Sequence, residues 1–330
     1  MPALLWLLPL AGLLLALVAG AAPLALYSVT LAPFGLAHVL CEFAYVDRRF
    51  GRRLNRAQVV LAIALLAGAA GFRAAGVFAV LMPGVALGLE LACVVLLVLA
   101  VTGAGRAGIA GLVLALPLAL AAALAPFATA TVLSIAHNFT PLAFLWEVLA
   151  ARGRRILMVP VLATFLGVPA LVVGGWPRML LGDEAGGGDP LGSGGLIASL
   201  HVYVPPFLAD GPAALDLFAA SAAAQGLHYL CVIVILPLLL GAGHRGLLPW
   251  SRTSIFAALV VFGSLMAFGG FLRDFGTARG IYGIVASVHA WAELPLIALI
   301  LGGRLQPIRT SPARKEMPLA MTESSSAGPA

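Results

Sequence analysis

Long apolar runs are the feature that most constrains this fold. A helix needs about 20 apolar residues to cross a bilayer. We interpret ten runs as spans, at residues 3–22, 27–46, 57–72, 78–103, 106–127, 128–150, 156–176, 213–240, 254–272 and 280–303. The third run is short enough to be tilted or partly interfacial. The turn that divides the fifth run from the sixth is weakly marked, and eight spans remain an alternative to ten.

The composition agrees with a membrane protein. Of the 330 residues, 62% are hydrophobic and 10% are charged, whereas a soluble domain has about 45–50% apolar and about 25% charged residues. This balance excludes a soluble enzyme, a disordered protein and a nucleic-acid-binding domain. The runs are continuous, unlike the alternating strands of a membrane β-barrel. The sequence predicts an all-α polytopic transmembrane helical bundle embedded in the lipid bilayer.

The basic residues predict the orientation, because cytoplasmic loops of membrane proteins are enriched in Lys and Arg. With ten spans, 15 basic residues fall on one side and four on the other, the four being Arg73, Arg178, Arg273 and Arg279. We therefore expect both termini to be cytoplasmic, in a cytoplasmic membrane of the bacterial type. The net charge of +6 is then a sign of topology, and no nucleic-acid partner is expected.

The chain divides into two parts by composition. Residues 1–303 form a single transmembrane helical domain, and the polar residues 304–330 are predicted to be a disordered cytoplasmic tail. The run within residues 1–22 lacks the basic start of a signal peptide, and we interpret it as a retained helix. The segment 196–208, which contains His201, is apolar but too short to span, and it fits a re-entrant or interfacial helix.

Four histidines lie inside apolar runs, on four separate predicted spans. His137 lies 15 residues before Arg152, His228 lies 17 before Arg245, and His289 lies 15 before Arg304. At 1.5 Å per residue these three lie about 22–26 Å from their arginines. His38, only 10 residues before Arg48, is expected to lie one to two turns deeper. A band of imidazoles near mid-membrane is the geometry that a buried metal or haem needs.

Two of these histidines have a glutamate four residues later. The pairs are His38 with Glu42 and His289 with Glu293. A spacing of four places both side chains on one helix face. Each glutamate can serve as a ligand or orient a neighbouring imidazole, and imidazole with carboxylate suits iron, zinc or manganese. The plainer alternative is that the histidines only bond helices to each other.

Other polar groups lie near this predicted cluster. Glu90 has no partner close in sequence, and Glu147 is expected to pair with the arginines that begin at Arg152. Pro141, Pro237 and Pro295 follow the cluster residues and can bend their helices. Candidate contacts to a substrate or to the ligands are Tyr45, Asn138, Tyr229, Trp291, Glu90 and His201, with Tyr229 also a candidate catalytic residue beside Glu42 and Glu293.

The set of intramembrane histidines resembles the Brp/Blh family of membrane-embedded β-carotene 15,15′-dioxygenases. The residues that carry it are His38 in Phe34–His38, His137 in Ala136–Asn138, His228 in Leu227–Tyr229, and His289. In the family the early histidine is followed by Gly and an acidic residue, whereas here His-Val-Leu-Cys-Glu stands. The resemblance implies iron held by the four histidines and cleavage of β-carotene to retinal with O₂.

Three functions that use these residues compete at this stage, and a structural or assembly protein with no chemistry is the fourth, least favoured alternative. The first is a non-haem iron oxygenase acting on a lipid-soluble substrate, such as a carotenoid, with O₂. The second is a haem-binding electron carrier with paired axial histidines. The third is a proton-coupled transporter with a His/Glu relay. The sequence gives no oligomeric state.

Overall fold

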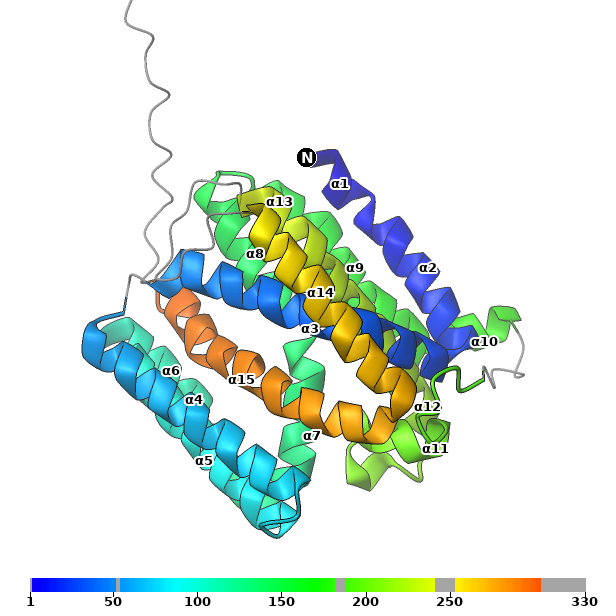
Figure 1. The fold of residues 1–330 in the computed structure, drawn as a ribbon. Helices are drawn as coiled ribbons and strands as arrows, with labels where there is room; N and C mark the ends of the chain where they lie inside the picture. Colours follow the sequence, from blue (N-terminus) through cyan, green and yellow to red (C-terminus); the bar gives the residue numbers. More distant parts are fainter. Residues whose placement is uncertain (1, 52–53, 182–187, 241–252, 304–330) are drawn as a thin grey trace, which may run out of the picture.

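The computed structural model describes residues 2–51, 54–181, 188–240 and 253–303. Within these ranges the chain forms helices and no strands (Figure 1). Ten helical stretches are long and apolar enough to cross a membrane, which confirms the all-α bundle and all ten predicted runs. The predicted tail 304–330 lies outside the described residues.

The spanning elements match the predicted runs closely. Their bounds are α1 Pro2–Trp6 with α2 Leu8–Ala21, α3 Pro23–Phe50, α4 Arg56–Val77, α5 Pro83–Thr102, α6 Gly105–Leu124, α7 Pro126–His137 with α8 Thr140–Ala151, η2 Arg155–Leu157 with α9 Met158–Val173, α12 Ala214–Leu230 with the π-turn η5 Cys231–Ile235 and α13 Leu236–Leu240, α14 Thr253–Arg273, and α15 Phe275–Leu301. The expectation that the third run is short is wrong, because α4 begins at an Asn55 capping box and continues for 22 residues.

The helices form two groups joined by a central helix. On one side α2, α3, α9 and α12 pack together, and on the other side α4, α5 and α6 pack in sequence (Figure 1). Helix α15 contacts α3 and all three helices of the second group. Segments α7 and α8 also contact both groups, so α15 and α7–α8 are placed to bring residues of both groups together.

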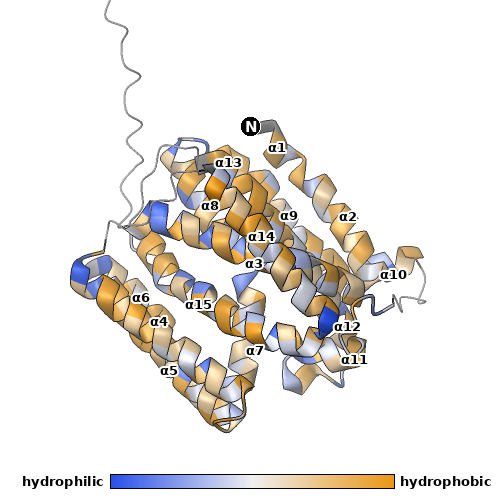
Figure 2. Cartoon of the chain, viewed as in Figure 1, coloured by the Kyte–Doolittle hydropathy of each residue, from blue (hydrophilic) through white to orange (hydrophobic). Residues whose placement is uncertain are grey.

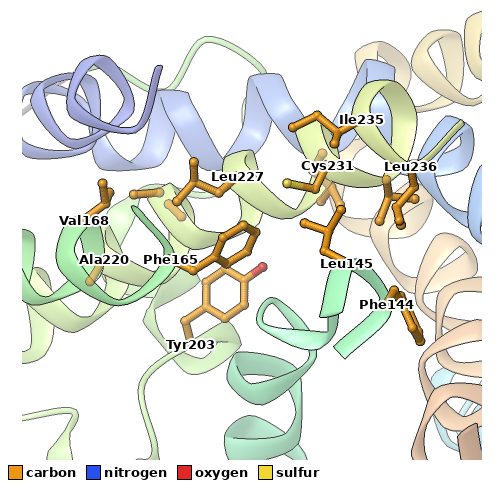
Figure 3. Packing of buried hydrophobic residues seen from close by; sticks show 14 of the residues in the cluster. Phe144, Leu145, Phe165, Val168, Tyr203, Ala220, Leu227, Cys231, Ile235 and Leu236 are labelled. Atoms are coloured by element: carbon orange, nitrogen blue, oxygen red, sulfur yellow. The ribbon is translucent and has the colours of Figure 1, made fainter. Parts of the chain in front are cut away.

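Hydrophobic residues make up most of the helices, while hydrophilic residues gather near helix ends (Figure 2). A dense core lies where α12 meets α8 and α9. There Leu227 and Cys231 of α12 and η5 pack near Phe165 of α9 and Leu145 of α8 (Figure 3). All four side chains are fully buried. This core fixes the rotation of α12, and with it the direction in which His228 points.

The segment 196–208 is not the single helix that its apolar pattern predicts. It forms three short turns, α11 Leu196–Ser199, η3 Leu200–Val202 and η4 Pro206–Leu208. Consecutive positive-φ glycines, Gly194 and Gly195, precede it. Asp189 accepts hydrogen bonds from the backbone N–H groups of Ser193, Gly194 and Gly195. Burial raises the pKa of Asp189, but the hydrogen bonds together outweigh burial, and the pKa is lowered.

Candidate metal centre

The structure brings all four intramembrane histidines into one buried cluster. The ring centroid of His137 lies 4.5 Å from that of His228 and 4.8 Å from that of His289. His38 lies 4.7 Å from His289 and 5.3 Å from His228, again between ring centroids. The predicted band of imidazoles is therefore a single site, built by α3, α7, α12 and α15.

The extra depth expected for His38 is wrong. Its Nε2 atom lies 3.0 Å from Nε2 of His289, so both rings are at one level. The error arises because Arg48 and Arg49 lie within α3 rather than beyond its end. Arg49 is buried and donates to Glu147, with Nε 2.8 Å from Oε2. An arginine held in this way does not mark the membrane edge.

Three imidazoles point the same ring nitrogen at one place. Nε2 of His289 lies 3.0 Å from Nε2 of His38 and 3.2 Å from Nε2 of His137. Two imidazole nitrogens bound at about 2.0–2.1 Å to one small cation, at angles near 90–100°, are separated by about 2.8–3.2 Å. The three side chains thus have the spacing of ligands that share a metal ion.

Glu293 holds His137 from behind. Its Oε2 lies 2.6 Å from Nδ1 of His137, and its Oε1 accepts a hydrogen bond of 3.1 Å from the Thr140 hydroxyl. A carboxylate can only accept, so Nδ1 of His137 carries the proton and Nε2 keeps its lone pair. A carboxylate behind a ligating imidazole is the usual outer partner of metal-bound histidine. Glu293 thus serves the histidine of another helix, and not His289 one turn earlier on α15.

Pro141 explains how His228 is oriented. Because proline has no N–H, the carbonyl of His137 lacks its normal helical donor, and α7 ends there. That carbonyl instead accepts the Thr140 hydroxyl at 2.8 Å and Nδ1 of His228 at 3.2 Å. Since a carbonyl accepts only, His228 donates from Nδ1 and turns Nε2 toward Glu42. The predicted break at Pro141 is confirmed.

Two acceptors then face each other in a dry place. Nε2 of His228 lies 3.5 Å from Oε2 of Glu42, and both side chains are 0% exposed. In the described part of the chain, neither carboxylate oxygen of Glu42 has a hydrogen-bond partner, nor has Nε2 of His228. Burying unpaired acceptors is costly unless a cation or proton joins them.

The charge of the site favours a divalent cation. Glu42 and Glu293 lie among the histidines, and within the described ranges neither forms an ion pair with Arg or Lys. Two groups of three residues each offer potential ligand atoms that lie within 4.8 Å of one another inside the group. They are His38–His137–His289 and Glu42–His137–His228. A divalent ion would balance the two carboxylates and occupy the converging lone pairs. The donor set fits a metal.

A cavity of about 600 Å³ opens beside the cluster. His38, His137 and His289 line the cavity, and so do the predicted contact residues Asn138, Tyr229, Trp291, Glu90 and His201. Tyr229 stacks on His38 with ring centroids 4.1 Å apart. Tyr45 does not line this cavity in the described structure; it packs on Phe144 at 4.8 Å between ring centroids.

Glu90 and Glu147 pair with residues of other helices, which the sequence did not predict. Glu90 accepts from Nε of Arg73 at 3.0 Å and from Nε1 of Trp291 at 2.7 Å. Glu147 pairs with Arg49 of α3, and not with the expected arginines that follow its own helix. Both glutamates thus form ion pairs outside the histidine cluster. Trp291, a candidate contact to a substrate or to the ligands, donates to Glu90.

Thr140, Gln225 and Tyr282 also belong to the site region and were missed by sequence reasoning. Thr140 positions Glu293. Gln225 donates to the Thr30 hydroxyl at 2.7 Å and accepts from Tyr203. Tyr282 lines the cavity near Gly35. The signal for Thr140 was its place beside Pro141; neutral residues such as Gln225 and Tyr282 carry no comparable signal in an apolar run.

His201 lies at the end of the cavity away from the cluster. Its Nδ1 donates to the carbonyl of Ala198 at 2.7 Å, and Arg279 donates from Nη2 to its Nε2 at 3.1 Å. Partial burial and the neighbouring guanidinium lower the pKa of His201. It is not part of the histidine cluster.

No protein-family model, curated protein or solved structure matches the chain.

Proposed function

We propose that this chain is a membrane-embedded, metal-dependent oxygenase that uses non-haem iron and acts on a lipid-soluble substrate. The observation that carries the proposal is the convergence of three histidine Nε2 atoms, 3.0 and 3.2 Å apart, in a buried site next to a cavity. Imidazole and carboxylate ligands suit iron, and iron so held supplies the chemistry that activates O₂.

The side chains have distinct tasks in this proposal. His38, His137, His228 and His289 hold the metal, with Glu42 as a further ligand or as a neighbour that orients His228. Glu293 keeps the proton of His137 on Nδ1 through its 2.6 Å contact. The His137 carbonyl does the same for His228. Four helices are thereby tied to one small site.

The cavity suits an elongated apolar molecule. Its wall beyond the histidines includes Leu31, Val77, Leu87 and Phe127 together with tyrosines. β-Carotene, the substrate of the family that the chain resembles, is the first candidate. In that reaction the central double bond breaks and each of its carbons receives one oxygen atom of O₂, giving two molecules of retinal without an external reductant.

We further propose that the protein lies in a cytoplasmic membrane with both termini inside, following the distribution of arginines in the sequence. Under this topology the histidine cluster lies within the bilayer, and the substrate reaches it laterally. Reactivity of single introduced cysteines at the helix ends, in intact vesicles, tests the sidedness.

The decisive experiment has two readouts. Purified protein loaded with Fe²⁺ without oxygen should retain iron, and cells that make β-carotene should lose colour and gain retinal on expression. Iron retention without a change of pigment would reject β-carotene as the substrate and would still support the metal centre. Negligible metal binding by folded protein sinks the proposal.

A proton-coupled transporter is the second candidate, supported by the buried contact of His228 with Glu42, which could pass a proton. Transport would survive strict removal of metal, whereas oxygenase activity would not. The haem alternative fits less well. Axial imidazoles stand on opposite faces of a porphyrin, and Nε2 atoms 3.0–3.2 Å apart leave no place for one between them.

A further inference from the structure

The end of the cavity farthest from the histidine cluster is positively charged. Arg279 of α15 lines this end, and His201 lies beside Arg279. Arg73 of α4 lines the cavity nearer the cluster, because its partner Glu90 also accepts from Trp291, two residues after His289. The end of α4 and the beginning of α15 meet where Gly280 packs against Val77. Arg73 is neutralised by Glu90, with Nε 2.8 Å from Oε2. Arg279 is the cation that needs an explanation.

Arg279 has no carboxylate partner in the described parts of the chain. It hydrogen-bonds to the Tyr27 side chain and donates to Nε2 of His201, whose Nδ1 donates to a carbonyl. His201 is therefore neutral and does not compensate the charge. The nearby Asp274 is engaged as a helix cap, accepting from the Thr277 backbone N–H at 3.0 Å and the Thr277 hydroxyl at 2.7 Å.

A partly buried guanidinium that faces a cavity and has no carboxylate partner among the described residues is suited to bind an oxyanion, because it offers two parallel N–H donors. Neutral His201 keeps the guanidinium in place without cancelling its charge. A carboxylate or phosphate in the cavity would complete this arrangement.

Between the two ends of the cavity lies an aromatic wall. Four of the five tyrosines of the chain line it, namely Tyr27, Tyr203, Tyr229 and Tyr282. Arg279 and His289 are ten residues apart on α15, which corresponds to about 15 Å along the helix. The cavity is thus polar at both ends and aromatic between them.

We propose that the substrate is an anionic amphiphile, an unsaturated chain with an oxyanion head group. The head binds Arg279, the chain follows the tyrosines, and a double bond roughly a dozen carbons from the head reaches the histidine cluster. This inference rests on the proposed function and replaces β-carotene as its first candidate substrate, since β-carotene has no anionic end. Cleavage of that double bond by O₂ forms two carbonyl groups, one on each fragment, and consumes no reductant.

Binding of cis-parinaric acid, a fluorescent polyunsaturated fatty acid, tests the inference directly. The full-length protein in nanodiscs of neutral lipid should bind the acid at least about tenfold more tightly than its methyl ester. Competition by oleic acid and by lysophosphatidic acid distinguishes a carboxylate from a phosphate head. Equal binding of acid and ester by the wild type would overturn the inference, and this comparison needs no variant.

Two arginines at the same membrane edge give a matched pair of variants. Arg279→Gln should abolish the preference for the acid, and Arg279→Lys should retain part of it. Arg273→Gln removes an exposed charge that does not line the cavity, and it should leave the preference intact. Equal loss in Arg279→Gln and Arg273→Gln would show a general surface effect and reject the assigned site.

Iron content separates this inference from the proposed function. Arg279→Gln lies far from the ligands and should retain wild-type iron. Iron retention without preference for the acid rejects the anionic substrate alone, whereas preference for the acid without iron rejects the oxygenase alone.

Discussion

Two spans of this protein have the same mean hydropathy and opposite surroundings. In the span Ala214–Leu239, 67% of the most apolar stretch is buried in the bundle, whereas in Arg56–Val77, which is helix α4, 6% is buried. Apolar content puts both in lipid, but it does not decide which one the protein surrounds.

Side-chain size accounts for the difference. Helix α12 has six buried alanines, at positions 214, 219, 220, 222, 223 and 224, so neighbouring helices approach closely. Helix α4 instead exposes Val60, Leu61 and Ile63. Within membranes, small residues favour close contact between helices. Large apolar residues gain little from such contact, because lipid tails are as apolar as they are. The close approach of small-residue helices is also what brings His228 to the other histidines.

The largest difference between inner and outer helices is expected for buried charge. Arg49→Met leaves Glu147 unpaired at a site where both side chains are almost fully buried, and it should cost about 3–5 kcal/mol of unfolding free energy. Arg56→Met changes an exposed residue of α4 and should cost little. Thermal unfolding in detergent measures both.

The double variant Arg49→Met/Glu147→Leu removes both charges and should recover most of the lost stability. If Arg49→Met and Arg56→Met unfold alike, the inner ion pair does not hold α3 to α8.

A second test uses one substitution on both spans. Ala223→Leu inserts a large side chain where the alanine is 0% exposed, and overpacking should cost about 1–3 kcal/mol. Ala64→Leu on α4 adds the same group at an exposed position and should change stability by less than about 0.5 kcal/mol. Equal melting temperatures for the two variants would contradict the assigned surroundings.

A third test concerns the site itself. Glu293→Gln removes the carboxylate behind His137 and should weaken metal affinity about 10–100-fold. Glu90→Gln removes another buried carboxylate of the cavity wall, which contacts Arg73 and Trp291 instead, and it should keep the metal. Competition with a chelator measures both affinities. Similar losses in the two variants would remove the special role of Glu293.

The smallest effect is expected from pH at the exposed His201. Because its pKa is lowered in the folded state, the unfolded chain binds more protons below the ordinary histidine pKa of about 6.5. The stability from the neutral ring is complete above that pH and is lost as the pH falls below it. His201→Gln should therefore flatten the stability profile slightly between about pH 7.5 and 5.5. A steeper profile in the variant would reverse the sign.

The sequence predicted the ten spans well because the free energy of moving a long apolar run into lipid depends on the composition of that run alone. It also predicted the four site histidines, since an ionisable group in such a run is costly and therefore marks a site. The break after His137 followed from Pro141, whose missing N–H is a local property.

Pairings between helices could not be predicted in the same way. They depend on which helices are neighbours and on how each is rotated, and neither appears in hydropathy. Glu293 therefore meets His137 rather than His289, Glu147 meets Arg49, and Glu90 meets Arg73. The predicted depth of His38 was wrong because it was measured from Arg48, which lies within α3 rather than beyond its end.

The central claim is that the converging histidines hold a metal. Its most direct test is elemental analysis of purified, Fe²⁺-loaded protein, comparing the wild type with His137→Ala and with His201→Ala as the control. The account predicts about one or more equivalents of iron in the wild type and in His201→Ala, and background iron in His137→Ala. Background iron in a folded wild type, or iron unchanged in His137→Ala, would contradict it.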